Sequence, residues 1–124
     1  MSERTLNVRL PSIPPPLSAC FKNARRHGRV KTKRYKEWIA GALPHLVGAP
    51  MIQGRIVVNY SYERIDRRRR DLGNLEKATS DILVTAGIIE DDSLIEKMTL
   101  AWGPGSGVEI KVREWVPGKE VQPC

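Results

Sequence analysis

The apolar residues between positions 72 and 86 recur at intervals of three and four, and this pattern constrains the fold more than any other feature. Residues at this spacing share one face of a helix. The stripe consists of Leu72, Leu75, Thr79, Ile82, Leu83 and Ala86, and Gly87, a natural helix stop, follows it directly. The pattern predicts an amphipathic helix over residues 72–86 that packs its stripe against a sheet.

Other segments predict the strands of that sheet. Residues 5–10 alternate apolar and polar side chains, and residues 54–64 are rich in β-branched and aromatic ones. The segments 97–103 and 107–115 flank a Pro-Gly-Ser-Gly turn, which predicts a hairpin. A second helix is predicted over residues 35–47, kinked or shortened by Pro44. The order of elements indicates the α+β class: one domain, residues 1–124, with a mixed sheet and about two main helices packed on one side.

The remaining segments predict loops and turns. Residues 11–19 contain four prolines, which favour an extended loop. The basic stretch at about residues 20–34 shows no periodicity and contains Gly28, so we expect a mobile loop that orders on a ligand. Residues 90–97 predict a turn into a short helical segment capped by Asp or Ser. The tail at about residues 116–124 is predicted to be loose.

The charge of the chain indicates a polyanionic partner. Its 124 residues carry 21 Lys and Arg against 14 Asp and Glu, a net charge of +7, with a pI near 9.8. A small basic domain favours nucleic acid, although a soluble protein that is merely basic is the plainer alternative. Two cysteines, Cys20 and Cys124, make no disulfide framework, and no apolar run is long enough for a membrane span or a signal peptide. We therefore expect a cytoplasmic protein that does not enter a membrane.

Polar side chains also gather on the helix predicted over residues 72–86. Asn74, Lys77 and Asp81 are spaced by three and four residues and share the side opposite the apolar stripe. Asp71 stands at the helix entrance, where an aspartate is a favoured N-cap. Lys77 and Asp81 also fit an exposed ion pair worth a few tenths of a kcal/mol. Each residue taken alone has such a local structural interpretation.

A pair of carboxylates after the helix suggests that these residues could act together as one site. Asp91 and Asp92 follow the helix, and Gly87 permits the chain to turn back toward Asp71. A plain surface turn is the alternative interpretation of this pair. Mg²⁺ prefers a few carboxylate oxygens and keeps waters for a substrate phosphate. Aspartates from two elements beside an arginine run and a lysine suit metal-assisted phosphodiester cleavage.

The segment "DRRRRDLGNLEKATSDILVTAGIIEDD", residues 66–92, resembles the RusA family of Holliday junction resolvases, crossover junction endodeoxyribonucleases of bacteria and their prophages. The matching positions are Arg70, Asp71, Asn74, Lys77, Asp81, Gly87, Asp91 and Asp92. The proline-rich start and the basic segment that follows it resemble the family's opening segment, so the resemblance covers most of residues 5–115.

The resemblance implies a homodimer that binds four-way DNA junctions in recombination and repair and nicks two opposed strands with Mg²⁺ or Mn²⁺. It implies Asp71, Lys77 and Asp92 as catalytic residues, with Asp71, Asp92 and Asp91 as metal ligands. The DNA-binding residues that we expect are Arg67, Arg68, Arg69, Arg70, Lys22, Arg25, Arg26, Arg29, Lys31 and Lys33.

The chain departs from the family pattern at Gly73, where the family has a metal-binding aspartate. Glycine supplies no ligand, and either Glu76 or Asp91 could move toward the gap. The alternative function is therefore a junction-binding protein with impaired or absent cleavage. An RNA-binding module is the third and weakest hypothesis, because Tyr35, Trp38 and Tyr60 are placed for a core rather than as a stacking platform.

Overall fold

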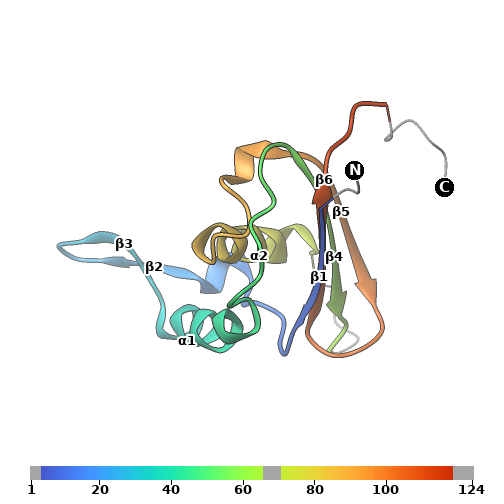
Figure 1. The fold of residues 1–124 in the computed structure, drawn as a ribbon. Helices are drawn as coiled ribbons and strands as arrows, with labels where there is room; N and C mark the ends of the chain where they lie inside the picture. The colour runs from blue at the N-terminus through green and yellow to red at the C-terminus, as the bar shows by residue number, and fades with distance from the viewer. Residues whose placement is uncertain (1–3, 66–70, 119–124) are drawn as a thin grey trace.

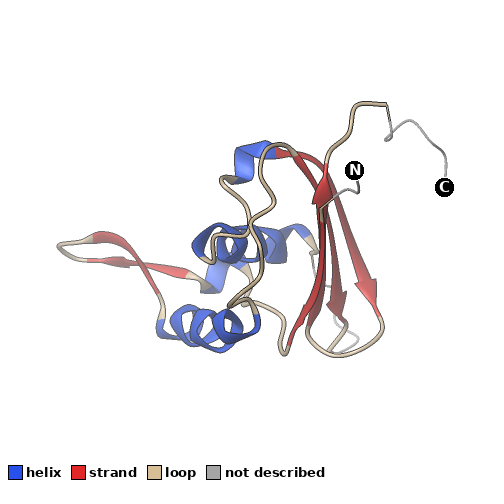
Figure 2. Ribbon diagram, viewed as in Figure 1, coloured by secondary structure: helices blue, strands red, loops and turns tan. Residues whose placement is uncertain are grey.

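A mixed four-stranded sheet with two helices on one face forms the body of the molecule (Figures 1 and 2). The computed structural model describes residues 4–65 and 71–118. The strands lie in the order β1-β6-β4-β5, and the α+β class is confirmed. The elements of this body are β1 (Thr5–Leu10), α1 (Lys33–Ala42), β4 (Ile56–Glu63), α2 (Gly73–Thr85), β5 (Ile95–Gly103) and β6 (Val108–Glu114).

Strand β4 lies inside the sheet, antiparallel to β6 and parallel to β5. The predicted hairpin of residues 97–103 and 107–115 is therefore wrong, because β4 separates its two strands. The connecting loop crosses the end of β4: Glu63 N–H donates to the Gly107 carbonyl at 2.8 Å, and Gly107 N–H donates to Glu63 Oε1 at 2.8 Å. A Cβ at Gly107 would lie 1.8 Å from the Leu10 carbonyl oxygen, so this close passage requires glycine.

The basic segment that we predicted as a loop is a two-stranded hairpin that projects from the body (Figure 1). Strand β2 (Phe21–Ala24) pairs antiparallel with β3 (Gly28–Lys31), and Gly28 takes a φ of +67° at the turn. Most of its side chains are exposed on both faces, so its sequence lacks the apolar alternation that identifies a half-buried strand.

Both helices begin and end for local reasons. Thr32 caps α1 by accepting a hydrogen bond from Tyr35 N–H at 3.2 Å, and Pro44 falls in a 3₁₀ turn, Leu43–His45, that follows the helix. The predicted shortening by Pro44 is thus confirmed. Helix α2 is followed by Gly87, whose φ of +75° is the left-handed conformation of a helix stop.

The structure can be compared with three more predicted segments: the proline-rich loop, the turn after α2 and the C-terminal tail. The predicted extended loop of residues 11–19 is wrong at its end, where Leu17–Ala19 forms a 3₁₀ turn. A further 3₁₀ turn, Asp92–Leu94, is capped by Asp91 and confirms the predicted short helical segment. The predicted loose tail is described only as far as Gly118, and residues 119–124 lie outside the described part.

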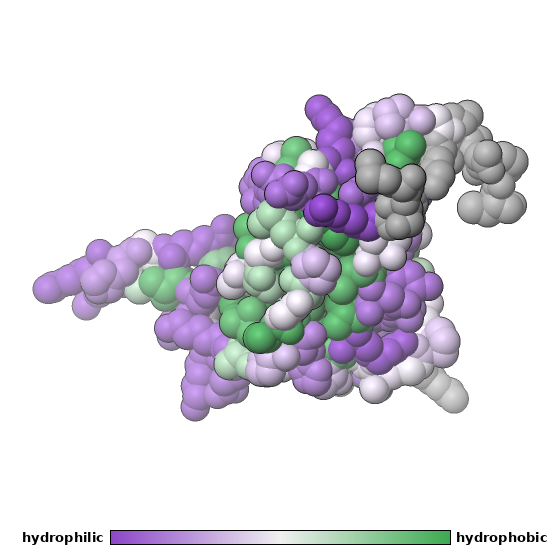
Figure 3. Space-filling view, in the orientation of Figure 1, coloured by the Kyte–Doolittle hydropathy of each residue, from purple (hydrophilic) through white to green (hydrophobic). Residues whose placement is uncertain are grey.

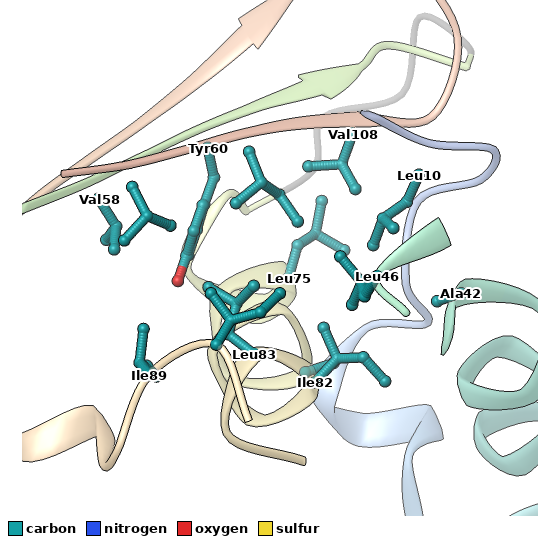
Figure 4. Close-up of a cluster of buried hydrophobic side chains, with 14 of the residues drawn as sticks. Leu10, Ala42, Leu46, Val58, Tyr60, Leu75, Ile82, Leu83, Ile89 and Val108 are labelled. Carbon is teal, nitrogen blue, oxygen red and sulfur yellow. The ribbon is translucent and has the colours of Figure 1, made fainter. Parts of the chain in front are cut away.

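The core fills the space between the sheet and the two helices (Figure 4). Tyr60 and Val108 point from the sheet toward Leu75, Ile82 and Leu83 of α2. These side chains are at most 4% exposed, so α2 is fixed against the sheet by its predicted apolar stripe. Within residues 4–65 and 71–118, no helix is long and apolar enough to cross a membrane.

Candidate active site on helix α2

Asp71 makes the contact expected of a residue that caps a helix. Its Oδ1 accepts a hydrogen bond from Gly73 N–H at 2.9 Å, and its carbonyl accepts one from Asn74 N–H at 3.1 Å. These contacts satisfy backbone donors that the first turn of a helix leaves unpaired. The exposed carboxylate of Asp71 therefore faces the start of α2, while its predicted role as a metal ligand stays a prediction.

Lys77 lies between two carboxylates. Its Nζ is 3.0 Å from Asp92 Oδ2 and 3.2 Å from Asp81 Oδ1. The chain reversal that Gly87 permits brings Asp92 to the helix, so two of the three predicted catalytic residues are in contact. Hydrogen bonds to Asp92 and then to Asp81 raise the pKa of Lys77 above its ordinary value. The lysine is therefore held in its charged form.

Asp81 is the partner of Lys77 that the predicted catalytic set leaves out. Its position four residues after Lys77 is the signal that identifies it, and that spacing predicts the observed ion pair. The structure adds a second carboxylate, Asp92, to the same ammonium group. The pair is thus one part of a three-residue cluster rather than an isolated surface contact.

Asp91 has different partners from its neighbour Asp92. Its carboxylate accepts hydrogen bonds from the hydroxyl and the N–H of Ser93, which lower the pKa of Asp91. Two adjacent aspartates therefore divide their contacts: Asp91 caps the short turn, and Asp92 faces Lys77. The simple surface-turn interpretation fits Asp91 better than Asp92.

A hollow of about 330 Å³, here called the lysine hollow, opens beside this cluster. Its charged lining combines Lys77 and Lys31 with Asp81, Asp91 and Asp92. Apolar side chains from α1 and α2 complete the wall. The lining is Lys31, Tyr35, Ile39, Lys77, Asp81, Ile82, Val84, Thr85, Asp91 and Asp92. Burial, followed by the charge of Asp81, raises the pKa of Tyr35 to about 12, so its hydroxyl stays neutral.

Glu76 lies on the other side of Asp92. The two residues line a second hollow of about 300 Å³ together with residues 95–98. The Ser80 hydroxyl donates to Glu76 Oε2 and also bonds the Tyr60 hydroxyl at 3.0 Å. The buried Tyr60 and Ser80 thus hold Glu76 in place. Whether Glu76 replaces the missing carboxylate stays a prediction.

The space at Gly73 admits a Cβ only with a small shift of Asp71. Its backbone is helical, and a Cβ built there would lie 3.3 Å from Asp71 Oδ1. The exposed Asp71 carboxylate can move by the few tenths of an ångström that such a Cβ requires. Position 73 precedes Glu76 and Lys77 by three and four residues, so a side chain there shares their side of the helix. A Cβ at position 73 therefore fits if Asp71 shifts slightly, and it would lie on the side of the helix that carries Glu76 and Lys77.

The described carboxylates do not form a ready-made cage for a metal. Among residues 4–65 and 71–118, no group of three or more His, Cys, Asp or Glu side chains could hold a metal ion. Mg²⁺ is commonly bound by one or two carboxylates and keeps several waters. Asp92 suits that mode, because its carboxylate is partly exposed and lines both hollows beside it.

The expected DNA-binding residues of the hairpin are all exposed, namely Lys22, Arg25, Arg26, Arg29 and Lys31. Figure 3 shows the projecting hairpin as hydrophilic over most of its length. Lys33 opens α1 and pairs with Glu37 at 3.8 Å. The predicted DNA-binding residues Arg67 to Arg70 lie outside the described part of the chain.

Comparison with known proteins identifies the family. The family model described as "Endodeoxyribonuclease RusA" matches residues 18–113, from the segment before the hairpin to the last strand. No curated protein matches the chain. The matched region contains the hairpin, α2 and the Asp91–Asp92 turn, so it includes Lys77 and the two carboxylates that pair with it. The chain belongs to the RusA family of Holliday junction resolvases.

Proposed function

We propose that the chain is a metal-dependent endonuclease that resolves four-way DNA junctions by paired nicks as a homodimer. One observation carries this proposal: the Lys77 ammonium is held by Asp92 and Asp81 at an open hollow on α2. The family match supports the nuclease class and the junction substrate.

The residues around the lysine hollow divide the work of phosphodiester cleavage. The Lys77 ammonium neutralises the charge that develops on the phosphate that is cut, and Asp81 and Asp92 keep it charged and in position. Asp71 and Asp92, with Asp91 nearby, would hold Mg²⁺ or Mn²⁺. That ion supplies Lewis-acid chemistry and an activated water when bound. The exposed arginines and lysines of the hairpin hold the DNA backbone.

The homodimer follows from the symmetry of the substrate. A four-way junction has approximate two-fold symmetry, and a two-fold dimer presents identical sites to two equivalent strands. We propose that this activity serves DNA recombination and repair in the cytoplasm of a bacterium or a phage-infected cell. A prophage origin is part of the same proposal.

Competition between two DNAs tests the substrate class. Purified protein is bound to a labelled four-way junction and challenged with unlabelled junction or with linear duplex of the same sequence. We expect the junction to compete more strongly and affinity to fall steeply with salt, because phosphate contacts release counterions. Equal competition by the linear duplex would contradict the junction assignment.

A second candidate function is junction binding without cleavage. Gly73 and the lack of a three-carboxylate group among the described residues favour it, because both reduce the ligands available to a metal. An RNA-binding module has less support. Tyr35, Trp38 and Tyr60 are all less than 10% exposed, so they offer no stacking surface.

A further inference from the structure

A third hollow, here called the hairpin hollow, joins the base of the hairpin to the start of α2 and has a volume of about 360 Å³. Four elements contribute to it: the first 3₁₀ turn, β2, β3 and α2. Its lining is Leu17, Ser18, Phe21, Lys22, Asn23, Arg29 and Asn74. None of these seven described residues carries a carboxylate, whereas three aspartates line the lysine hollow.

The polar groups of the hairpin hollow suit an anion. Lys22 and Arg29 are cations, and the amides of Asn23 and Asn74 and the Ser18 hydroxyl can each donate a hydrogen bond. Asn74 also stands in the first turn of α2, where the helix dipole favours negative charge. Charge and hydrogen-bonding capacity therefore agree on an anionic ligand.

Arg29 is held in place before any ligand arrives. Its guanidinium lies 4.2 Å from the centre of the Phe21 ring, and Asn23 faces it across the β2–β3 pair. The Phe21 ring in turn meets the edge of Tyr35, with ring centres 5.5 Å apart. Tyr35 is 2% exposed, so the core anchors the ring that the half-buried Phe21 packs against. A guanidinium fixed in this way loses less entropy when it binds a phosphate.

The size and walls of the hollow indicate more than a bare phosphate. Leu17 and Phe21 form an apolar part of the wall against which a sugar can pack. One face of the Phe21 ring is already covered by Arg29, so the ring is not an open platform for a base. The chemistry fits the sugar–phosphate unit of one nucleotide.

Helix α2 connects this hollow to the candidate active site. Asn74 precedes Lys77 by three residues, so the two side chains lie about one helical turn apart on neighbouring positions of the same face. We propose that the hairpin hollow binds the backbone phosphate and deoxyribose of a nucleotide close to the one cut at Lys77, with Asn74 as its positioning residue. This inference rests on the proposed function and adds a defined subsite to it.

Junctions with a single neutral methylphosphonate test the subsite. The substitution is moved one position at a time along the strand, and binding by the full chain is measured at each position. We expect one position near the nick to reduce affinity several-fold in the unchanged protein. In Arg29→Gln, that position should lose its effect, because the phosphate has lost its partner. The same loss of affinity in both proteins at that position would overturn the proposal.

Two matched substitutions separate the subsite from general charge repulsion. Asn74→Asp places a carboxylate in the hairpin hollow, and Asn7→Asp places one on the exposed side of β1. We expect Asn74→Asp to reduce affinity about tenfold and make the salt dependence shallower, with little change for Asn7→Asp. Equal losses in the two variants would overturn the subsite. Thermal melting of both proteins shows whether a loss reflects folding instead.

The methylphosphonate series is repeated on linear duplex, so that failure of the junction function can be told from failure of the nucleotide subsite. A duplex that binds as tightly as the junction but still shows a sensitive phosphate position would contradict the proposed function and support the subsite. Inorganic phosphate and a free nucleotide are added as competitors. We expect neither to compete at millimolar concentration, since the subsite is one contact of a larger DNA surface. Strong competition by phosphate alone would contradict a nucleic-acid subsite.

Discussion

The two faces of α2 differ in what holds them. Leu75, Thr79 and Leu83 are at most 4% exposed and pack between the helix and the sheet. On the opposite face, Lys77 keeps about half of its side-chain surface exposed to solvent and pairs with the carboxylates of Asp81 and Asp92. Residues of the buried face should control stability, and residues of the exposed face should control activity.

Polar groups on the buried face are fully paired. The Thr79 hydroxyl donates to the Leu75 carbonyl at 2.9 Å and bonds the Tyr62 hydroxyl at 2.7 Å. In the described part of the chain, every buried side-chain nitrogen and oxygen has a partner. The buried face can therefore carry hydroxyl groups without a large desolvation cost.

The largest effect is expected for Leu83→Ala on the buried face. Leu83 is 0% exposed, and truncation leaves a cavity in addition to the lost burial. The free energy of unfolding should fall by about 2–5 kcal/mol, measured by urea denaturation. A loss below about 1 kcal/mol would show that the helix is not anchored at this residue.

Lys77→Met is the matching change on the exposed face. Nicking of a four-way junction should slow about 10²–10³-fold, since a charged donor to the phosphate is removed. Its ion pairs are solvent-exposed, so the unfolding free energy should change by less than about 1 kcal/mol. The rate is measured under single-turnover conditions. A large loss of stability with unchanged rate would reverse the assignment of the two faces.

Alkaline pH should weaken the buried face selectively. Burial raises the pKa of Tyr60 and Tyr62 well above the ordinary value of 10. The stability that they contribute is present below pH 10 and is lost as pH rises from 10 toward their folded-state pKa, because the unfolded chain ionises first. The loss should approach about 1.4 kcal/mol per pH unit for each tyrosine. Denaturation at pH 9 to 11, with Tyr62→Phe as a control, measures it; a flat profile would contradict the burial.

The smallest effect is expected for Gly73→Ala. Alanine in the first turn of α2 should raise the unfolding free energy by up to about 1 kcal/mol, since glycine is the poorer helix former. Alanine adds no charge, so junction affinity should stay unchanged. Thermal melting checks the stability of the variant, and a junction-binding assay checks its affinity. A destabilised variant would show that the Asp71 carboxylate does not move away from the new Cβ.

Local patterns predicted the helices well and the pairing of strands poorly. The stripe of α2, its stop at Gly87 and the shortening of α1 at Pro44 depend on neighbours in sequence, and the structure confirms them. Strand β5 pairs with β4, which is distant along the chain, so the turn between β5 and β6 wrongly predicted a hairpin. The hairpin of residues 21–31 was missed because no buried face gives it a periodic pattern.

The candidate site divides in the same way. The Lys77–Asp81 contact follows from helical spacing, and the motif resemblance placed Lys77 and Asp92 in one site. The approach of Asp92 to Lys77 depends on the chain reversal after α2. The sequence allows that reversal, but its spacing does not predict it. The link between Asn74 and the hairpin had no sequence signal, because it joins two elements that are far apart in the chain.

Cleavage of a synthetic four-way junction in the presence of Mg²⁺ tests the central claim most directly. The unchanged chain is compared with Gly73→Asp, which restores the carboxylate of the family pattern, and with Gly73→Asn, a neutral side chain of similar size. We predict paired nicks by the unchanged chain and nicking about tenfold faster or more by Gly73→Asp alone. Junction binding without nicks by any of the three proteins would contradict the nuclease account.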